Sequence, residues 1–254
     1  MVEEKPTRKA PQELPRTDLG MDNLQVALSF FVLGQPFPAD FFDKVNKDEL
    51  KSLAQEGNVE AQFLWGRANA VKMGLLKNDS EAVKWYRKAA EQGHARAQYH
   101  LGRMYANGTG VDKDERQAVS WYRKAAEQDY ARAQHNLGWM YANGTGVIKD
   151  EQEAVKWYRK AADQGDAFAQ HNLGGMYSNG WGVTKDEREA AKWYRKAADQ
   201  EHGWAQYAMG RCCLFGIGVS ENRTTAQSWL HKAYENTDDG AKNAASKLWA
   251  ERPK

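Results

Sequence analysis

Residues 97–126 read AQYHLGRMYANGTGVDKDERQAVSWYRKAA, and the pattern returns 36 residues later, at residues 133–162, as AQHNLGWMYANGTGVIKDEQEAVKWYRKAA. The same period extends outward in both directions without an insertion or a deletion. It is marked by five tryptophans, at Trp85, Trp121, Trp157, Trp193 and Trp229. A fixed period of this length is typical of an array of stacked supersecondary units.

Each unit has the pattern of two helices joined by a glycine-rich loop. Ala97, Leu101 and Met104 fall at i, i+4 and i+7, which is one apolar stripe of an amphipathic helix. Residues 107–111 contain two glycines and interrupt the stripe, because glycine disfavours helix and permits positive φ. A second stripe follows, formed by Ala118, Trp121, Tyr122, Ala125 and Ala126.

The start of each second helix carries a capping-box spacing, in which a short polar residue precedes a Glu or Gln by three positions. The pairs are Asn78 with Glu81, Asp114 with Gln117, Asp150 with Glu153 and Asp186 with Glu189. Small residues such as Gly102 let the two helices approach closely, and the tryptophans fill the space between hairpins.

One hairpin cannot bury both of its faces, so neighbouring hairpins must stack. The sequence therefore predicts an all-α fold, a right-handed superhelical solenoid of two-helix 36-residue repeats with capping helices. We expect a flexible leader (1–20), amino-terminal capping helices (21–57), five repeats (58–93, 94–129, 130–165, 166–201 and 202–237) and a carboxy-terminal capping helix (238–254).

The pattern Ala-Gln-x-x-Leu-Gly-x-Met-Tyr-x-x-Gly-x-Gly-Val, followed by Ala-x-x-Trp-Tyr-x-Lys-Ala-Ala, resembles the Sel-one-like repeat, a relative of the tetratricopeptide repeat. The first copy departs from it with Asn69 in place of the tyrosine, and the fifth has Cys212 and Cys213 in place of Met-Tyr. The resemblance implies an adaptor that holds partner proteins. It also points to a bacterial group of immunity proteins that neutralise phospholipase toxins delivered by type VI secretion.

Composition excludes several other classes of protein. The 254 residues include 41% hydrophobic residues, which is too many for a disordered chain. The 36 basic and 34 acidic residues leave a net charge of +2, so no global field favours nucleic acid or anionic lipid. No apolar stretch approaches the roughly 20 residues that span a bilayer. The adjacent Cys212 and Cys213 cannot supply a disulfide framework, and we expect both to be core thiols.

Motifs for catalysis, metal binding or cofactor binding do not stand out. The chain has no His-Glu-x-x-His, Cys-x-x-Cys, Gly-x-Ser-x-Gly or phosphate-loop pattern. His135 and His171 lie one repeat apart, and packed helices are about 10 Å apart, which is too far for two ligands of one zinc ion. We therefore predict a protein that is not an enzyme and uses no metal or cofactor.

Function is expected where the copies differ, because recurring residues are needed for packing. In similar tetratricopeptide solenoids the first helix of each pair lines the concave face. Relative to the leucine of the Leu-Gly pair, the exposed positions lie five and two residues before it and two and six residues after it. Residues at these positions, together with Trp181 from a loop, form the predicted partner-binding set. The set is Arg96, Tyr99, Arg103, Arg132, His135, Trp139, Phe168, His171, Trp181, Trp204, Tyr207 and Arg211.

The predicted surface is rich in arginine towards its amino-terminal end and in aromatic rings towards its carboxy-terminal end. Arginine and aromatic side chains are favoured at the centres of protein interfaces. An alternative applies to one row of rings, which would instead pack against the first helix of the next repeat. That row consists of Phe63, Tyr99, His135, His171 and Tyr207.

The leading hypothesis is a non-enzymatic solenoid that binds a partner protein in its concave face, in one form a bacterial immunity protein that neutralises a secreted phospholipase-type toxin. The alternatives are an adaptor for envelope or signalling complexes and a helical-repeat protein that binds single-stranded RNA. The balanced charge counts against nucleic acid. We expect a monomer when free and no membrane span. We also expect a periplasmic location if an export signal preceded Met1, and otherwise a cytoplasmic one.

Overall fold

The computed structural model describes residues 46–71 and 76–250, and within these ranges the chain forms twelve helices and no strand. The helices are α3 (Lys47–Gln55), α4 (Val59–Ala70), α5 (Asp79–Glu91), α6 (Ala95–Asn107), α7 (Glu115–Glu127), α8 (Ala131–Asn143), α9 (Glu151–Asp163), α10 (Ala167–Asn179), α11 (Glu187–Ala198), α12 (Gly203–Phe215), α13 (Arg223–Glu235) and α14 (Asp239–Ala250).

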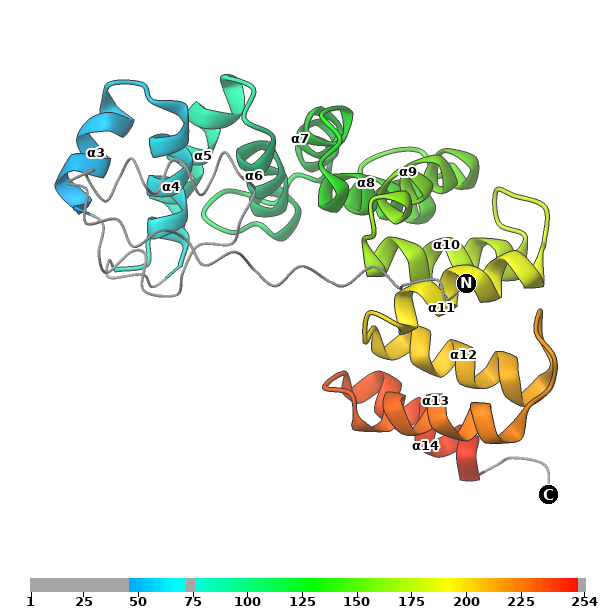
Figure 1. Ribbon diagram of the computed structural model, residues 1–254. Coiled ribbons are helices and arrows are strands. Elements are labelled where there is room, and N and C mark those ends of the chain that lie inside the picture. Colours follow the sequence, from blue (N-terminus) through cyan, green and yellow to red (C-terminus); the bar gives the residue numbers. More distant parts are fainter. Residues whose placement is uncertain (1–45, 72–75, 251–254) are drawn as a thin grey trace, which may run out of the picture.

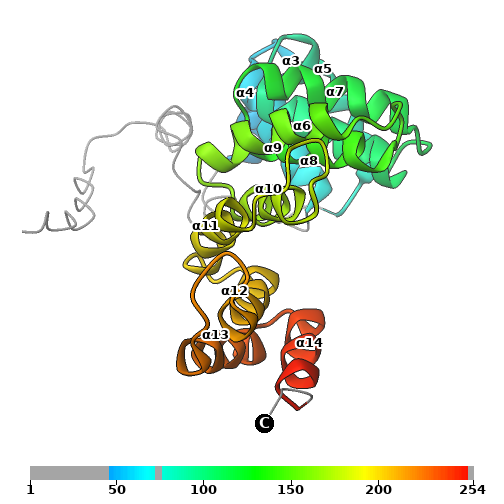
Figure 2. The ribbon, with the colours of Figure 1, turned by 90° about the vertical axis from the view of Figure 1, so that its right-hand side faces the viewer.

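Each predicted repeat contributes one helical hairpin, from α4–α5 to α12–α13, and each hairpin packs on the next. Figure 1 shows the hairpins following one another along a bent path, with α3 and α14 at opposite ends. A second view shows α14 beside the last hairpin, where it contacts α13 and α12 (Figure 2). The predicted helical solenoid is thus confirmed. The predicted leader (1–20) and the predicted amino-terminal cap up to residue 45 lie outside the described residues.

The predicted starts of the second helices are correct. Asp114 Oδ1 accepts a hydrogen bond from the Gln117 amide at 3.0 Å, and the equivalent side chains cap α5, α9 and α11. The Glu or Gln that lies three positions after the cap has another role in the first repeat. There the Glu81 carboxylate accepts from Lys84 Nζ at 3.1 Å and from Trp85 Nε1 at 2.8 Å.

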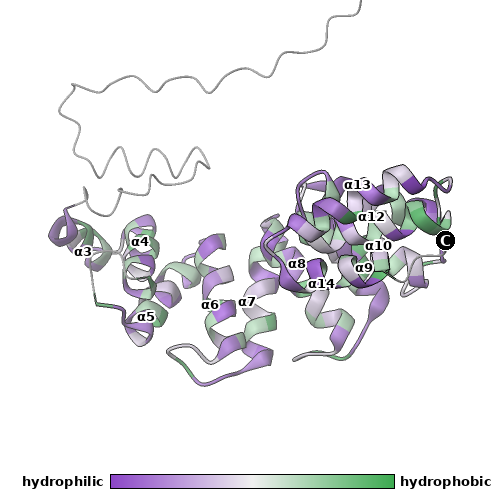
Figure 3. Cartoon of the chain, turned by 90° about the horizontal axis from the view of Figure 1, so that it is seen from below, coloured by the Kyte–Doolittle hydropathy of each residue, from purple (hydrophilic) through white to green (hydrophobic). Residues whose placement is uncertain are grey.

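The apolar stripes face the interior of each hairpin and the joint with the next one. Figure 3 shows hydrophobic and hydrophilic residues on the same helices, as expected of helices with one buried side. The glycine after each core leucine lies under a tyrosine of the second helix. A Cβ placed on Gly102 would lie 2.8 Å from the ring of Tyr122, so a larger residue there would push the helices apart. The stem of Lys124 covers the buried Trp121, with Nζ 4.1 Å from the ring centroid.

A buried glutamine in each first helix joins three helix ends. Gln98 Nε2 donates to the Ala90 carbonyl at the end of α5, and Gln98 Oε1 accepts from Gln128 Nε2 at the end of α7. We call this pattern the glutamine relay. It recurs at Gln62, Gln134 and Gln170, while Asn236 replaces the donor that pairs with Gln206. Each of these glutamines is at most 4% exposed, so the hydrogen bonds satisfy amide groups that burial would otherwise leave unpaired.

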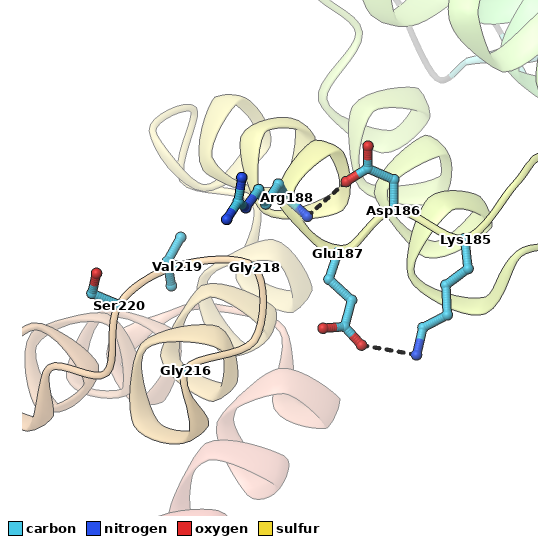
Figure 4. A pocket seen from close by; sticks show the side chains of 8 residues that line it. All are labelled: Lys185, Asp186, Glu187, Arg188, Gly216, Gly218, Val219 and Ser220. Carbon is cyan, nitrogen blue, oxygen red and sulfur yellow. Dashed lines mark hydrogen bonds and ion pairs between the residues drawn. The ribbon is translucent and has the colours of Figure 1, made fainter.

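The loop between the two helices of one repeat docks on the preceding repeat. In Figure 4 the loop that carries Gly216 and Gly218 lies beside Glu187 and Arg188 at the start of α11. A Cβ on Gly218 would lie only 1.9 Å from the Glu187 carbonyl oxygen. Gly110, Gly146 and Gly182 meet the preceding repeat in the same way. The second loop glycine therefore serves the joint between repeats as well as the turn.

Candidate binding groove

A cavity of about 700 Å³ lies on the first helices of the first three repeats. It is lined by Arg67 of α4, by Arg96 and Arg103 of α6 and by Arg132 of α8. These arginines occupy the positions from which the sequence predicts a basic amino-terminal half of the concave face. Side chains from successive first helices therefore face one common space. We call it the arginine cavity, and we call the surface that the first helices continue towards α12 the groove.

Positive charge dominates the lining of the arginine cavity. Lys77 Nζ lies 2.9 Å from Asp79 Oδ2, so the one carboxylate among the described residues of the lining is already paired. Arg103 and Arg132 are exposed, and neither forms an ion pair within residues 46–71 and 76–250. The Arg103 guanidinium lies 5.9 Å from the centre of the Tyr99 ring, which holds it over an aromatic face.

His100, which is not among the residues predicted from the sequence, also lines the arginine cavity. Its imidazole stacks on Tyr86, with ring centroids 5.2 Å apart and an interplanar angle of 14°. Burial, followed by the nearby charge of Arg103, lowers the pKa of His100 to about 3, so the ring is neutral at physiological pH. The sequence does contain a pattern that predicts this position. His100 lies four residues after Arg96 and three before Arg103, on the same helical stripe.

The prediction that Tyr99 is exposed in the groove is wrong. Tyr99 is only 8% exposed, since its ring packs edge-on against Tyr130 at 5.2 Å and against Tyr122 at 5.9 Å. Phe63, in the same row, is 1% exposed and stacks on His94. In both cases the residue that precedes the next first helix covers the ring. The alternative, packing against the next repeat, therefore holds for these two residues.

Large aromatic side chains are exposed on the third, fourth and fifth repeats, three of them on first helices and Trp181 in the loop after α10. Trp139 is 46% exposed, Phe168 61% and Trp181 52%. Trp204 is 38% exposed, because its ring also lies against Gly240 at the start of α14. These four residues form what we call the aromatic surface. Phe168 and Trp204 stand at the position that Arg96 and Arg132 hold in earlier repeats, so the chemistry of the groove changes from one end to the other.

The predicted histidines lie half-buried between the first helices. His135 Nδ1 is 3.1 Å from Asn136 Oδ1, and its Nε2 is 3.1 Å from Asn172 Nδ2, so both ring nitrogens have partners. His171 stacks on His202 at 5.0 Å, and burial lowers the pKa of His171 to about 4. These residues therefore hold neighbouring repeats together, as the alternative for this row requires.

The last two predicted residues belong to α12. Tyr207 is half-buried and meets Trp204 edge-on, with ring centroids 5.9 Å apart. Arg211 is exposed one turn further along. It stands at the position of Arg67 and Arg103, but outside the lining of the arginine cavity.

Reactive chemistry is sparse in the part of the chain that the structure describes. It holds no cluster of three or more His, Cys, Asp or Glu side chains suited to a metal ion. Cys212 and Cys213 are buried free thiols, as predicted, and burial raises the pKa of Cys212 to about 11. Neither cysteine is thus poised as a nucleophile. None of the described helices has the length and apolarity that a membrane crossing needs.

Comparison with known proteins identifies the repeat. The model of the Sel1 repeat matches residues 59–94, 95–130, 131–166, 167–202 and 205–238. None of the curated proteins compared with the chain matches it. A Sel1 repeat protein from Oxalobacter formigenes is 33% identical, with a TM-score of 0.77 over 90% of this chain and 88% of that one.

Two further solved structures are similar. A protective antigen of uropathogenic Escherichia coli with the same repeat fold is 33% identical, with a TM-score of 0.51 over 80% of this chain and 51% of that one. An immunity protein from Pseudomonas aeruginosa is 22% identical, with a TM-score of 0.47 over 76% of this chain and 81% of that one, a likeness that carries no functional argument. The five matched segments span more than half of the sequence. The chain therefore belongs to the Sel1 repeat family.

Proposed function

We propose that the protein binds a partner protein along the groove and carries out no chemistry of its own. The observation that supports this most is the aromatic surface. Four large rings are at least 38% exposed on the third, fourth and fifth repeats, and Trp139 shares α8 with Arg132 of the arginine cavity. Large exposed rings often mark an interface, and aromatic and arginine side chains contribute most of the binding energy there.

The experiment compares capture of partners by the wild type and by a groove variant, Trp139→Ala combined with Phe168→Ala. Ile148→Ser is the matched control, because Ile148 is a 90% exposed apolar side chain outside the first helices. We expect one partner to be retained stoichiometrically by the wild type and the control and lost with the groove variant. A partner that stays bound to the groove variant, or is lost with the control, would contradict the proposal.

A more specific form of the proposal is an immunity protein that covers the active-site mouth of a secreted phospholipase-type toxin, acting in the periplasm. The exposed arginines and rings are the anchors that such an occluding interface needs. The captured partner is assayed for phospholipase activity with and without the chain. Inhibition that the groove variant has lost supports this form. A partner without such activity would leave the general proposal standing and exclude the immunity role.

A further inference from the structure

The two ends of the groove differ in charge. Four arginines line the arginine cavity from three successive first helices, and Arg103 and Arg132 among them form no ion pair within the described ranges. The only carboxylate among the described residues of that lining, Asp79, is paired with Lys77. At the other end, Phe168 and Trp204 stand at the position that Arg96 and Arg132 hold in earlier repeats. The position of Arg103 is taken by Trp139 in the third repeat and by Gly175 in the fourth. A ligand that complements the whole groove must therefore carry negative charge at one end and apolar groups at the other.

Resting on the proposed function, we propose that the partner presents an acidic segment, whose carboxylates enter the arginine cavity and whose neighbouring apolar side chains lie on the aromatic surface. Arginine suits a carboxylate because its planar guanidinium can donate two parallel hydrogen bonds. Arg103 and Arg132 form no ion pair within the described ranges, so their donors are available to such a ligand.

His100 adds a neutral partner to the charged ones. It lies stacked on Tyr86 at the wall of the cavity, and burial and the arginines keep it uncharged above pH 4. Positive charge in the cavity therefore comes from arginine and lysine alone, and we expect the affinity for a carboxylate to stay nearly constant from pH 6 to pH 8. Protonation of His100 makes no contribution in that range.

The length of the segment follows from the spacing of the helices. Helices do not pack closer than about 8–10 Å, so the path across the five first helices from α4 to α12 covers at least about 40 Å. An extended peptide advances about 3.3 Å per residue, so at least about 12 residues are needed to span the groove. The carboxylates would occupy about half of this length, over α4, α6 and α8, and the apolar side chains the rest.

Single-stranded RNA is the other ligand that combines negative charge with flat rings, and the groove fits it less well. A nucleic-acid backbone carries one charge per nucleotide, so its binding sites present basic groups along their whole length. Here the basic positions stop after Arg132, with Arg211 alone further along α12. The net charge of the whole chain is only +2.

The test is selection of displayed random 12-residue peptides on the full-length wild-type chain. Binding of the selected peptides, and of a 12-nucleotide oligouridylate, is then measured by fluorescence polarisation. We expect the selected peptides to be rich in Asp or Glu next to apolar residues. Arg103→Glu combined with Arg132→Glu should weaken their binding by about tenfold or more. Arg116→Glu combined with Arg188→Glu is the control, because it changes the net charge equally at exposed positions of the second helices, outside the groove.

The outcomes separate this inference from the proposed function. Peptides that depend on Trp139 and Phe168 but are unaffected by reversal of Arg103 and Arg132 would overturn the inference and leave protein binding in the groove intact. If the control pair weakened peptide binding equally, the effect would come from the net charge of the protein and not from the arginine cavity. That result would also overturn the inference. Tighter binding of the oligouridylate than of the best peptide would replace the acidic segment with RNA.

Discussion

Gln164 Nε2 donates a hydrogen bond to Gln134 Oε1, 2.7 Å away, across the end of the third repeat. Gln134 is fully buried, and its own Nε2 donates to the Ala126 carbonyl of the second repeat at 3.1 Å. One side chain therefore satisfies backbone and side-chain groups from two repeats. The glutamine relay therefore stabilises the joint between neighbouring repeats, in addition to the apolar packing of the tryptophans.

Replacing Gln134 with Ala should cost about 2–4 kcal/mol of unfolding free energy, because it removes two hydrogen bonds made at a buried position, one to the Ala126 carbonyl and one from the Gln164 amide, and opens a space. Gln164→Ala is the matched variant. Gln164 is exposed, so in this variant water can take the place of its amide and donate to Gln134 Oε1, and the loss should be about 0.5–1.5 kcal/mol. Urea unfolding followed by circular dichroism measures both. Equal losses would mean that the relay does not depend on burial.

Gly146 should tolerate no side chain. Its φ is 69°, and a Cβ would lie 2.4 Å from the Glu115 carbonyl oxygen of the preceding repeat. Gly146→Ala therefore adds a clash to backbone strain of about 1–3 kcal/mol. We expect faster hydrogen exchange at the start of α7 as well as a lower unfolding free energy.

Gly165→Ala is the control for that substitution. Gly165 also has positive φ, at 93°, but nothing lies within 4 Å of the added Cβ. Asp129 and Glu201 occupy the equivalent position in other repeats with φ of 59° and 64°. The loss should therefore stay near 1 kcal/mol. A loss as large as that of Gly146→Ala would show that strain alone, without the contact between repeats, explains both.

Substitution of a core tryptophan should lower stability, whereas substitution of a groove tryptophan should weaken partner binding. Trp157 is 9% exposed, and Trp157→Ala should destabilise the fold by about 3–5 kcal/mol, as large core deletions do. Trp139 is 46% exposed, and Trp139→Ala should change stability by about 0.5 kcal/mol or less while weakening partner binding. Thermal unfolding and a binding assay on the same preparations distinguish the two. Similar losses of stability would place Trp139 in the core.

Acid should destabilise the fold partly through His100. Its pKa is about 3 in the folded chain, while an unfolded histidine titrates near 6.5, so below pH 6.5 the unfolded state binds a proton that the folded state does not. Stability is therefore lost as the pH falls from about 6.5 towards 3. One such group accounts for about 2 kcal/mol between pH 7 and pH 5.

His100→Asn removes this titration and is structurally modest, because Asn136 and Asn172 occupy the equivalent position in later repeats. We expect the difference in unfolding free energy between wild type and variant to shift by about 2 kcal/mol in favour of the variant between pH 7 and pH 5. A difference that does not change with pH would show that His100 is charged, or solvated, in the folded protein.

The fold could be predicted from the sequence because its strongest signals are local. The spacing of the tryptophans and the caps such as Asp114 fix the helices, and the structure has them where expected. The glutamine relay could not be derived in this way. Gln98 recurs visibly in the pattern, but its partners Ala90 and Gln128 lie 8 and 30 residues away, so the bonds exist only once repeats are stacked.

The site could be predicted in part. Arg96, Arg103 and Arg132 line one cavity because their positions share a stripe of the first helix. Tyr99 is rotated by about 60° from Arg96 around a helix with 3.6 residues per turn, which carries it under Tyr130 of the next repeat. That cover comes from another unit, so one repeat examined alone gives no sign of it.

The loop glycines and the relay tie each hairpin only to its immediate neighbours, and the groove residues take part in neither. The exposed groove residues Arg103, Arg132 and Trp139 therefore stand at other positions of the 36-residue unit than the loop glycines and the relay glutamines. Exchanging one whole unit for another would alter the order of charged and aromatic groups that a ligand meets, while the loop glycines and the glutamine relay would join the units as before. Such a scaffold can acquire new ligands by shuffling or duplicating its modules, one at a time.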